Sequence, residues 1–435
     1  MMLLCLSAAS LLPCAGSNAI AGQQLAAQAP AVSVPPELKP NHINVAGVVR
    51  RVPHEICTDR SYDEEILKKV DERVRKNYFS EEPASKVWPP ALERDRAKIL
   101  ASRNFIELFK SINGALSSLK SSHTEFATDN DEIFYFLHDL FGRFRANLRV
   151  KMDYVGFVTG PPRFADDCVR YVLDGSPAAK AGILVGDRIL AVDGNGYIGV
   201  ANFFGKSGKQ VAIDLERNGV KEQVQLTPKK ADDYLEYVSA IRKSVYTFTA
   251  GKHTCGYVHD WCGGQEAHNA LEETIGDKLS NTDGLILDLR DGYGGNSLED
   301  LDMFYRPAAG FAPFTMKSRD GKATTDHMYY DKPVVAIIND GARSGKELLA
   351  YSLKKTGRAK LVGLNTAGAV LGGRMFVLDK HCILYLAVTD CTIGGERLEG
   401  VGVAPDLVVA DQTSGAGKAA QVEAAKDELA KLLEK

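Results

Sequence analysis

The sequence predicts a multidomain protein that combines α+β and α/β parts, and three observations support this fold class. At 435 residues the chain is too long for one ordinary hydrophobic core. Its patterning changes twice, from helical periodicity to short β-rich runs and then to alternating strands and helices. We therefore expect an N-terminal helical segment over 43–148, a β-rich module over 149–230, an α/β core over 235–412 and a C-terminal helix over 413–435.

The first residues, "MMLLCLSAASLLPCAGSNAIAGQQ", are an uncharged apolar run that ends in small residues. Ala19-Ile20-Ala21 fits the A-x-A pattern before a cleavage site, which predicts a signal peptide over 1–21 and a periplasmic or secreted protein. No Lys or Arg precedes the run, so a start further upstream stays open. "LLPC" before Cys14 is a poor lipobox, and membrane association is expected only if a lipid is attached there. Residues 22–42, rich in Ala, Gln and Pro, are typical of a linker.

Helical periodicity dominates residues 61–121. Ile66, Val70 and Val74 are spaced by four, and a second apolar stripe follows the i, i+3, i+4, i+7 pattern of an amphipathic helix. A further helix is expected over about 130–145, with Asn130 or Asp131 as its cap. The second stripe consists of Phe105, Leu108, Phe109, Ile112, Leu116 and Leu119.

Residues 149–228 contain short β-branched runs, such as "RILAVDG" and "QVAIDLERNG", separated by Gly, Pro and Asn-Gly turns. From about residue 245, strand-like runs such as "KPVVAIIND" alternate with helical runs such as "GKELLAYSLKKTG". That alternation is typical of an α/β domain. The last stretch, "AAQVEAAKDELAKLLEK", predicts a terminal helix.

Composition excludes several classes of function. A formal net charge of −3, with 25% charged residues, gives no reason to expect nucleic-acid binding. No C-x-x-C doublet or H-E-x-x-H helix is present, so zinc is not expected. In an oxidising compartment Cys255 with Cys262, and Cys382 with Cys391, are candidates for disulfides, although spacing alone does not determine the connectivity.

Ser344 poses the central question of the α/β region. In local terms Ser344-Gly345-Lys346-Glu347 is an S-x-x-E capping box at the head of an apolar-periodic helix, and a cap needs no catalytic duty. A hydroxyl at a helix N-terminus also gains from N–H groups that stabilise a developing oxyanion, but it attacks nothing without a base. Both interpretations fit the local sequence.

Within the β-rich module, "GSPAAKAGILVGDRILAVDG" (175–194) resembles the middle of a PDZ domain of the kind found in bacterial processing proteases. The resemblance places the carboxylate-binding loop of such domains at "YVGF", which implies peptide binding by Val155, Gly156 and Phe157. A peptide would add there as a strand, with its C-terminal carboxylate held by backbone N–H groups. The alternative is a module that packs against its neighbours and binds nothing.

Three stretches of the remaining chain resemble the S41 peptidases, the family of C-terminal processing proteases, tricorn core proteases and the chlamydial protease-like factor. They are a strand with a glycine turn, a nucleophile strand and helix with the following strand, and a closing E-x-x-G-V-x-P-D hairpin. The resemblance implies a ClpP/crotonase-like core and Ser344 as the nucleophile. The stretches are "DGLILDLRDGYGGN" (283–296), "INDGARSGKELLAYSLKKTGRAKLVGLNTAGA" (338–369) and "LEGVGVAPDLVV" (398–409).

The general base decides the mechanistic class. In the processing-protease branch a lysine follows T-x-G, and here that position holds Ala369. The tricorn-like branch instead takes a histidine from the turn before the PDZ position and a glutamate from the closing hairpin. The resemblance thus implies His123 as base and Glu399 as its partner, with Glu396 close enough to replace Glu399. His259 and His268 are rivals for the base that match no family motif.

The implied activity is an extracytoplasmic serine endopeptidase that hydrolyses protein or peptide substrates through an acyl-enzyme. The oxyanion donors expected are the N–H of Gly345 and that of Gly294 or Gly295 in the glycine turn. Substrates would be selected through their C-termini by the PDZ module, and a homo-oligomer stays open. Two alternatives remain: an inactive S41-like PDZ scaffold, and a Ser–Lys processing protease whose lysine position, 369, has been altered.

Overall fold

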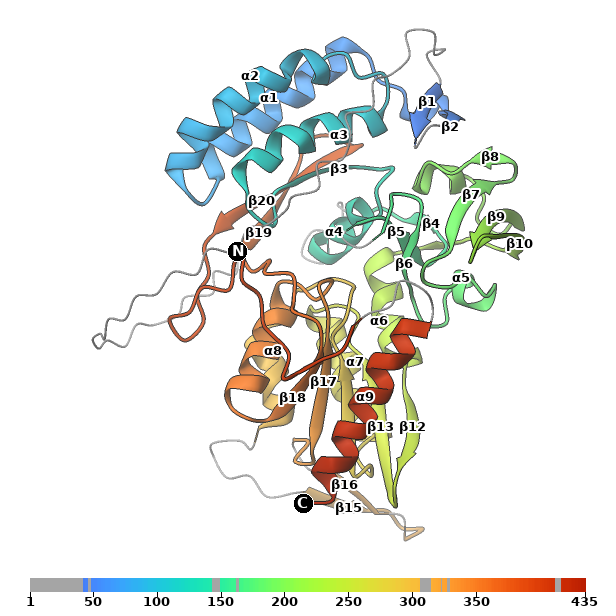
Figure 1. Cartoon of the computed structure of the whole chain (residues 1–435), viewed down its shortest axis with the longest axis vertical. Helices are drawn as coiled ribbons and strands as arrows, with labels where there is room; N and C mark the ends of the chain where they lie inside the picture. The colour runs from blue at the N-terminus through green and yellow to red at the C-terminus, as the bar shows by residue number, and fades with distance from the viewer. Residues whose placement is uncertain are drawn as a thin grey trace. The chain divides into compact units, whose positions relative to one another are not determined.

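The computed structural model describes residues 42–45, 48–142, 149–161, 164–305, 314–321, 323–326, 329–410 and 416–435. All of the described elements belong to one compact unit, Leu38–Lys435 (Figure 1). The predicted signal peptide over 1–21, and the predicted linker over 22–42 except for its last residue, lie outside the described residues. None of the described helices combines the length and the apolarity needed to cross a membrane.

The N-terminal part consists of helices α1 (Arg60–Asn77), α2 (Trp88–Ile99) and α3 (Phe105–Leu116). Side-chain caps set where two of them begin, because Asp59 accepts from the Tyr62 N–H and Asn104 from the Glu107 N–H. The apolar stripes predicted from the sequence face one shared core. Short elements around these helices are β1 (His42–Val45), β2 (Val48–Arg51), η1 (His54–Ile56), η2 (Pro83–Val87) and η3 (Ser117–Leu119).

The helices do not close this core by themselves. An antiparallel sheet of order β19-β20-β3 packs against them, made of β3 (Glu125–Thr128), β19 (Gly372–Val377) and β20 (Cys382–Thr389). Leu384 and Leu386 of β20 share the core of the helices. Residues that are more than 240 positions apart along the chain therefore meet here, and β3 begins directly after the turn that carries His123.

The β-rich module has its own hydrophobic core and is entered and left at one place, where β4 pairs antiparallel with β11. Its four-stranded sheet has the order β10-β9-β7-β8, and β5 pairs with β6. The elements are β4 (Met152–Tyr154), β5 (Phe157–Thr159), β6 (Val169–Val172), α5 (Pro177–Lys180), β7 (Arg188–Val192), β8 (Asn195–Gly196), η5 (Val200–Phe203), β9 (Val211–Arg217), β10 (Val220–Leu226) and β11 (Lys229–Ala231).

The α/β region is built on a six-stranded sheet of order β12-β13-β14-β17-β18-β21, parallel except where β12 meets β13. All residues of β14 and β17 are buried, as expected for central parallel strands covered on both faces. The strands are β12 (Tyr246–Ala250), β13 (His253–His259), β14 (Gly284–Asp288), β17 (Val334–Ile338), β18 (Ala359–Gly363) and β21 (Leu407–Val408).

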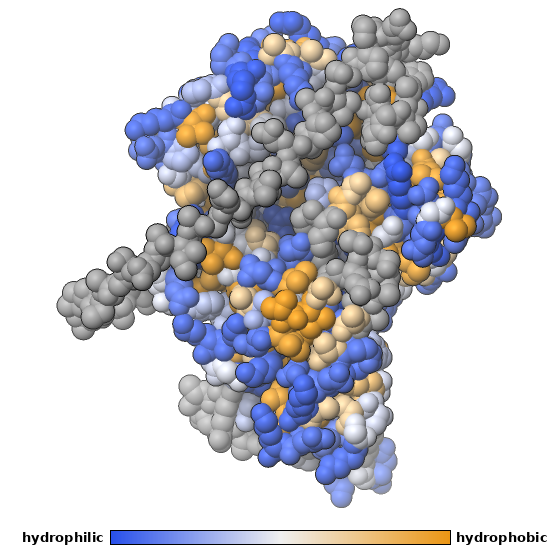
Figure 2. Space-filling model, in the orientation of Figure 1, coloured by the Kyte–Doolittle hydropathy of each residue, from blue (hydrophilic) through white to orange (hydrophobic). Residues whose placement is uncertain are grey.

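Helices α7 (Gln265–Glu273) and α8 (Gly345–Lys355) share a core with one face of this sheet, and α9 (Ala416–Leu433) shares a core with the other. Figure 1 shows α9 running across the strands. Figure 2 shows hydrophilic residues over most of this side of the molecule. The remaining elements are α4 (Glu132–Gly142), α6 (Asp233–Lys243), η6 (Thr274–Lys278), η7 (Leu298–Phe304), β15 (Phe314–Lys317) and β16 (Ala323–Asp326).

Two local predictions were wrong. The segment 398–409 is not a hairpin, because β21 lies parallel to β18 and the residues before it form a turn and an extended loop. Neither Asn130 nor Asp131 caps α4 with its side chain. The Asn130 amide instead donates to the Ile198 carbonyl and accepts from the Ala201 N–H, which ties the start of α4 to the β-rich module.

The two candidate cysteine pairs form no disulfide. Cys255 lies early in β13 and Cys262 follows its end, so an extended strand separates them. Cys382 and Cys391 are separated in the same way by β20. Five residues of extended strand already span about 13 Å, whereas a disulfide requires Cα atoms within about 7 Å.

Candidate active site

Ser344 lies between the carboxyl end of β17 and the start of α8. Its backbone has φ 56° and ψ −128°, a conformation that residues other than glycine rarely adopt. Ordinary N-cap residues have extended backbone angles instead. Strain of this kind costs about 1–3 kcal/mol and is found mainly at functional sites. The backbone therefore distinguishes Ser344 from a serine that only caps a helix.

The strained turn is held by Glu347 and by the loop that contains Ala369. The Ser344 N–H donates to the Ala369 carbonyl at 2.8 Å and to the Glu347 carboxylate at 3.2 Å. The same buried carboxylate accepts from Thr366 Oγ1 and from the N–H groups of Gly368 and Ala369, at 2.6 to 2.7 Å. Position 369 thus lies directly beside the serine, where a lysine would have been within reach.

His123 is the next member of the site. It lies in the turn between η3 and β3 with φ 53°, and its side chain is 4% exposed. Its Nδ1 lies 2.8 Å from Ser122 Oγ, and Ser122 Oγ lies 2.8 Å from Glu399 Oε2. The Ser122 N–H donates to the other oxygen of Glu399 at 2.8 Å, and the Val370 N–H donates to Oε2 at 2.9 Å.

This chain of hydrogen bonds assigns the tautomer of His123. A hydroxyl has a single proton to donate, and an ionised carboxylate only accepts. Ser122 therefore donates to Glu399 and accepts from His123, which puts the imidazole proton on Nδ1. The lone pair of Nε2 is left to accept a proton. Glu399 acts on the imidazole through Ser122, and not by the direct contact that the sequence suggested.

Burial lowers the pKa of His123 to about 3, and the positive charge of Arg343 adds to the effect. The imidazole is therefore neutral at every pH at which the protein is expected to work. A neutral imidazole with a free Nε2 is the form that a general base requires.

His123 and Ser344 line the same cavity, which has a volume of about 570 Å³. The two side chains form no hydrogen bond with one another, and such contacts often tighten only when substrate binds. The rest of the lining is mostly apolar, with Arg343 and Glu266 as its charged residues. The apolar and aromatic lining residues are Ile133, Phe136, Leu137, Leu140, Phe141, Tyr293, Leu371 and Tyr385.

The glycine turn after β14 lies against the serine. A Cβ placed on Gly294 would lie 2.4 Å from the Cβ of Ser344, and one on Gly345 would lie 2.4 Å from the backbone of Asn296, so only glycine fits at either position. Gly295 has φ 101°, which also favours glycine. The N–H groups of Gly294, Gly295 and Gly345 donate to no other described residue. Gly294 and Gly295 also line the cavity that contains Ser344.

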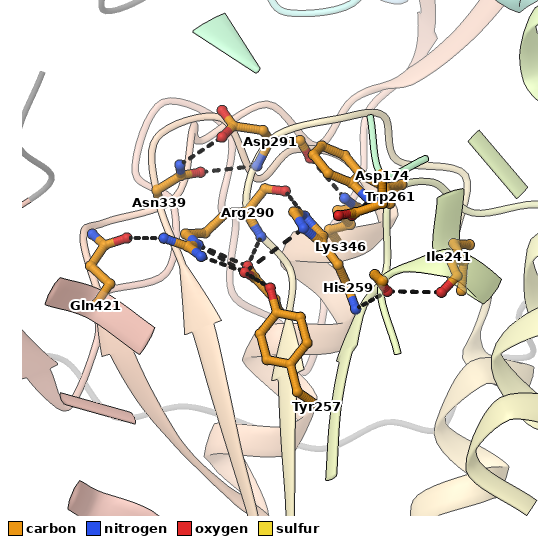
Figure 3. A network of polar contacts seen from close by, with 12 residues as sticks. Asp174, Ile241, Tyr257, His259, Trp261, Arg290, Asp291, Asn339, Lys346 and Gln421 are labelled. Carbon is orange, nitrogen blue, oxygen red and sulfur yellow. Dashed lines mark hydrogen bonds and ion pairs between the residues drawn. The ribbon is translucent and has the colours of Figure 1, made fainter. Parts of the chain in front are cut away.

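A buried polar network holds the start of the glycine turn in place (Figure 3). The Arg290 guanidinium binds the Asp288 carboxylate and donates to Gln421 of α9 at 2.9 Å. Lys346, two residues after Ser344, donates its Nζ to the Asp291 carbonyl at 2.7 Å, and Figure 3 shows it inside the network. Lys346 does not line the cavity, so it is placed to support the turn and not to serve Ser344 as a base.

The rival residues lie elsewhere. Glu396 is exposed and pairs with Lys355 at 2.8 Å on the surface of α8. His259 is buried, stacks on Trp261 at 3.6 Å and faces the Arg290 carbonyl at 2.8 Å. His268 contacts Asp300 at 2.7 Å. Neither histidine lines the cavity that contains Ser344.

The predicted peptide-binding loop joins β4 to β5. Val155 and Phe157 are buried in the core of the β-rich module. Gly156 has φ 87°, and a Cβ there would lie 2.2 Å from the Cβ of Ser176. Beyond the loop, β5 pairs with β6 along one edge, and no other described strand pairs with it. Its residues line a second cavity of about 340 Å³ together with the segment 197–200.

A family model described as "Peptidase family S41" matches residues 254–409, and a PDZ domain model matches residues 168–196. Residues 254–409 form an S41 peptidase domain. The match contains Ser344, the glycine turn and Glu399, whereas Ser122 and His123 lie outside it. His123 and Ser122 are thus brought to the S41 domain by a segment that precedes the PDZ domain.

Curated proteins similar to this chain are named as processing proteases. It is 27% identical over 261 residues to a carboxy-terminal-processing protease of Bartonella bacilliformis, covering 54% of this chain and 57% of that one. It is 28% identical over 205 residues to the carboxy-terminal processing protease CtpB of Bacillus subtilis, covering 44% and 42%. The chain therefore matches only about half the length of these relatives.

A solved structure, that of the tricorn protease, shares the fold. The TM-score is 0.51 at 20% sequence identity, and the alignment covers 89% of this chain and 38% of tricorn. The expected fold class, with helical, PDZ and S41 parts, is confirmed.

Ser122 is the residue of this site whose role sequence reasoning missed. The resemblance pointed to the Ser122-His123 pair, but it implied a role only for the histidine. A hydroxyl directly before the histidine was the one available signal, and its meaning depends on where Glu399 lies.

Proposed function

We propose that this protein is a serine endopeptidase in which Ser344 attacks the scissile carbonyl of a protein or peptide substrate. His123 takes the serine proton at Nε2 and later gives it to the leaving amine. The observation that carries the proposal is that Ser344 and His123 line one cavity, and that Ser344 has a strained backbone. The Nδ1 of His123 is held by Ser122, which in turn is bound to Glu399.

The remaining groups have supporting roles. Ser122 and Glu399 are positioning residues, since they fix the tautomer and stabilise the imidazolium that forms during reaction. The N–H of Gly345 and that of Gly294 or Gly295 hold the oxyanion of the tetrahedral intermediate. Acyl-enzyme formation releases the C-terminal product, and water activated by His123 then releases Ser344. No metal or organic cofactor enters these steps.

We also propose that the PDZ domain presents substrates by their C-termini. The free edge of β5 supports this, because a peptide can add to it as a further strand and the second cavity runs along it. That cavity reaches Tyr293 and Arg343, beside the nucleophile. A fluorescent peptide with a free C-terminus is expected to bind the Ser344→Ala protein more tightly than its amidated form. Gly156→Val, which clashes with Ser176, should remove the difference.

A fluorophosphonate reagent tests the catalytic proposal. Wild type should be labelled, whereas Ser344→Ala and His123→Ala should not. Ser297→Ala and His268→Ala are matched controls, because Ser297 also begins a helix and His268 also contacts a carboxylate, yet neither lines the cavity. Labelling that survives in Ser344→Ala would exclude Ser344 as nucleophile. Absence of label on wild type would favour an inactive scaffold.

The Ser–Lys alternative has its own test. Ala369 is 8% exposed, so Ala369→Lys places a charged side chain in a small buried space. We expect it to lower the activity of wild type and not to restore His123→Ala. Recovery of hydrolysis in the His123→Ala, Ala369→Lys double variant would show that a lysine serves this serine.

An extracytoplasmic location is proposed from the apolar N-terminal run. Sequencing the N-terminus of the mature protein checks it, with a start after Ala21 as the expected result.

A further inference from the structure

Arg343, the residue before Ser344, lines both cavities of the site. One is the cavity shared by His123 and Ser344, and the other runs along β5 of the PDZ domain. Ile133 and Tyr293 are the other residues common to the two linings. A peptide that extends from the PDZ domain to the nucleophile would therefore pass beside Arg343.

The Arg343 guanidinium is half-buried and forms neither a hydrogen bond nor an ion pair with any residue that the structure describes. A guanidinium has five N–H donors, and leaving them unpaired away from bulk water is unfavourable. The other cations of the second cavity have partners: Arg50 binds Asp167 at 3.3 Å, Lys110 binds Asp166 at 3.1 Å, and Arg170 donates to the Pro161 carbonyl.

Most carboxylates along the second cavity are already engaged. Asp131 accepts from Thr128, and Glu132 accepts from the hydroxyls of Tyr237 and Tyr293. Glu125 is the exception. Burial raises the pKa of Glu125 while the charge of Arg343 opposes that rise, yet the two side chains form no ion pair. Arg343 thus lies next to the nucleophile with Glu125 as a nearby charge, but with no ion pair or hydrogen bond to any described residue.

We propose that Arg343 binds a carboxylate of the substrate within about three residues of the scissile bond, since an extended chain advances about 3.3 Å per residue. The inference rests on the proposed function and names its substrate class: peptides that carry an acidic side chain, or a free C-terminus, at that place. The planar guanidinium matches a carboxylate with two parallel hydrogen bonds, which a neutral amide cannot accept equally well.

Matched peptides test this assignment. The set comprises decapeptides of Ala, Leu and Ser with one Glu or one Gln near the middle, each with a free or an amidated C-terminus. Within each pair of peptides that differ only in Glu against Gln, or only in a free against an amidated C-terminus, the ratio of the two kcat/KM values is measured at one pH. Any effect of Arg343 on the ionisation of His123 cancels in that ratio, because it changes both peptides equally.

For wild type we expect a ratio of about 10 or more in favour of the carboxylate peptide, because a site built to bind a group discriminates against an analogue that lacks it. Arg343→Gln should bring the ratio close to 1, and Arg343→Lys should leave part of it. Arg374→Gln removes the same charge from the exposed face of β19, outside both linings, and should leave the ratio unchanged. Glu125→Gln should raise the ratio, because it removes the competing carboxylate.

The two sources of the carboxylate give different results. A Glu-over-Gln preference in both the free and the amidated peptides assigns the acidic side chain, and a free-over-amidated preference without a Glu-over-Gln preference assigns the C-terminus. If both the Glu-over-Gln and the free-over-amidated ratios of wild type are near 1, or if Arg343→Gln changes neither, the inference is overturned even if hydrolysis is rapid.

Binding keeps the inference testable without catalysis. Calorimetric titration of Ser344→Ala with the four peptides should show the same preference, and Ser344→Ala with Arg343→Gln should lack it. If wild type neither cleaves the peptides nor reacts with fluorophosphonate, the proposed function fails, and the titration alone then decides whether Arg343 binds a carboxylate.

Discussion

Two elements of this protein, α8 and η7, begin with a serine followed three residues later by an acidic residue, and the two serines are in different situations. Ser297, at the start of η7, has φ −110° and ψ 174°, accepts from the Glu299 N–H and is exposed. Ser344, at the start of α8, has φ 56°, faces a cavity and lies opposite a neutral histidine.

The difference teaches that a capping box describes only the helix end. In both cases the acidic residue reaches back to the serine N–H, at 2.9 Å from Asp300 and 3.2 Å from Glu347. What separates the two serines comes from other parts of the chain, namely the 122–123 turn, the glycine turn and the 366–369 loop. The variants described next test whether Ser344 and Ser297 differ in this way and how large the difference in activity or stability is.

The largest effect is expected from removing each hydroxyl. Ser344→Ala should lower kcat for peptide hydrolysis by about 10⁴-fold or more, because loss of a nucleophile costs that much in other serine peptidases. Ser297→Ala should leave kcat unchanged and lower the free energy of unfolding by about 1 kcal/mol, as loss of an N-cap does. Kinetics and urea unfolding of both variants measure the two effects. Equal losses of activity would contradict the distinction.

Removing the hydroxyl of Ser122 should make Ser344 less reactive and so more like Ser297, because His123 loses its link to Glu399. We expect Ser122→Ala to lower kcat about 10²-fold, since a base with an unfixed tautomer is a poor catalyst. Ser121→Ala is the neighbouring control, and Ser122→Thr, which keeps the hydroxyl, should retain most activity. If Ser122→Ala is fully active, Ser122 does not position His123.

The pH dependence of kcat/KM tests the buried histidine, His123, which shares a cavity with Ser344 but not with Ser297. Because burial lowers the pKa of His123 to about 3, the acid limb of kcat/KM should lie well below pH 6.5, the ordinary value for histidine. Arg343→Gln should move that limb upward, since a charge that disfavours the imidazolium is gone.

The same shift affects stability. Between pH 6.5 and about 3 the unfolded chain binds a proton at His123 that the folded protein does not, so the free energy of unfolding falls as the pH falls through this window. His123→Gln should reduce that fall, as measured by urea unfolding at several pH values. An unchanged slope would mean that His123 titrates normally in the folded state.

The smallest effect concerns backbone strain. Relief of the unfavourable φ at Ser344 is worth about 1–3 kcal/mol, against about 0.5–1 kcal/mol for the added freedom of glycine in the unfolded chain. Ser344→Gly should therefore be more stable than wild type by about 1 kcal/mol, and inactive. Ser297→Gly, at an ordinary φ, should gain nothing. A destabilised Ser344→Gly would show that the turn carries no strain.

Much of the fold was predictable because local patterns and packing agree. The stripe from Phe105 to Leu116 forms α3, and the alternation after residue 245 forms the parallel sheet with its helices. The three-stranded sheet was not predictable, because β3 and β20 pair across more than 240 residues and neither strand carries a signal that names its partner. The cap of α4 failed for a similar reason, since Asn130 bonds to the β-rich module instead.

The sequence by itself determined which residue types stand at Ser344, His123, Glu399 and the glycine turn, and that position 369 is an alanine. Only the tertiary structure decided what they do together. It placed Ser122 between His123 and Glu399, buried the imidazole so that it stays neutral, and left Arg343, beside Ser344, without an ion pair to any described residue. The physical reason is that hydrogen bonding and desolvation depend on distance in space, and these segments are separated by up to 277 residues along the chain.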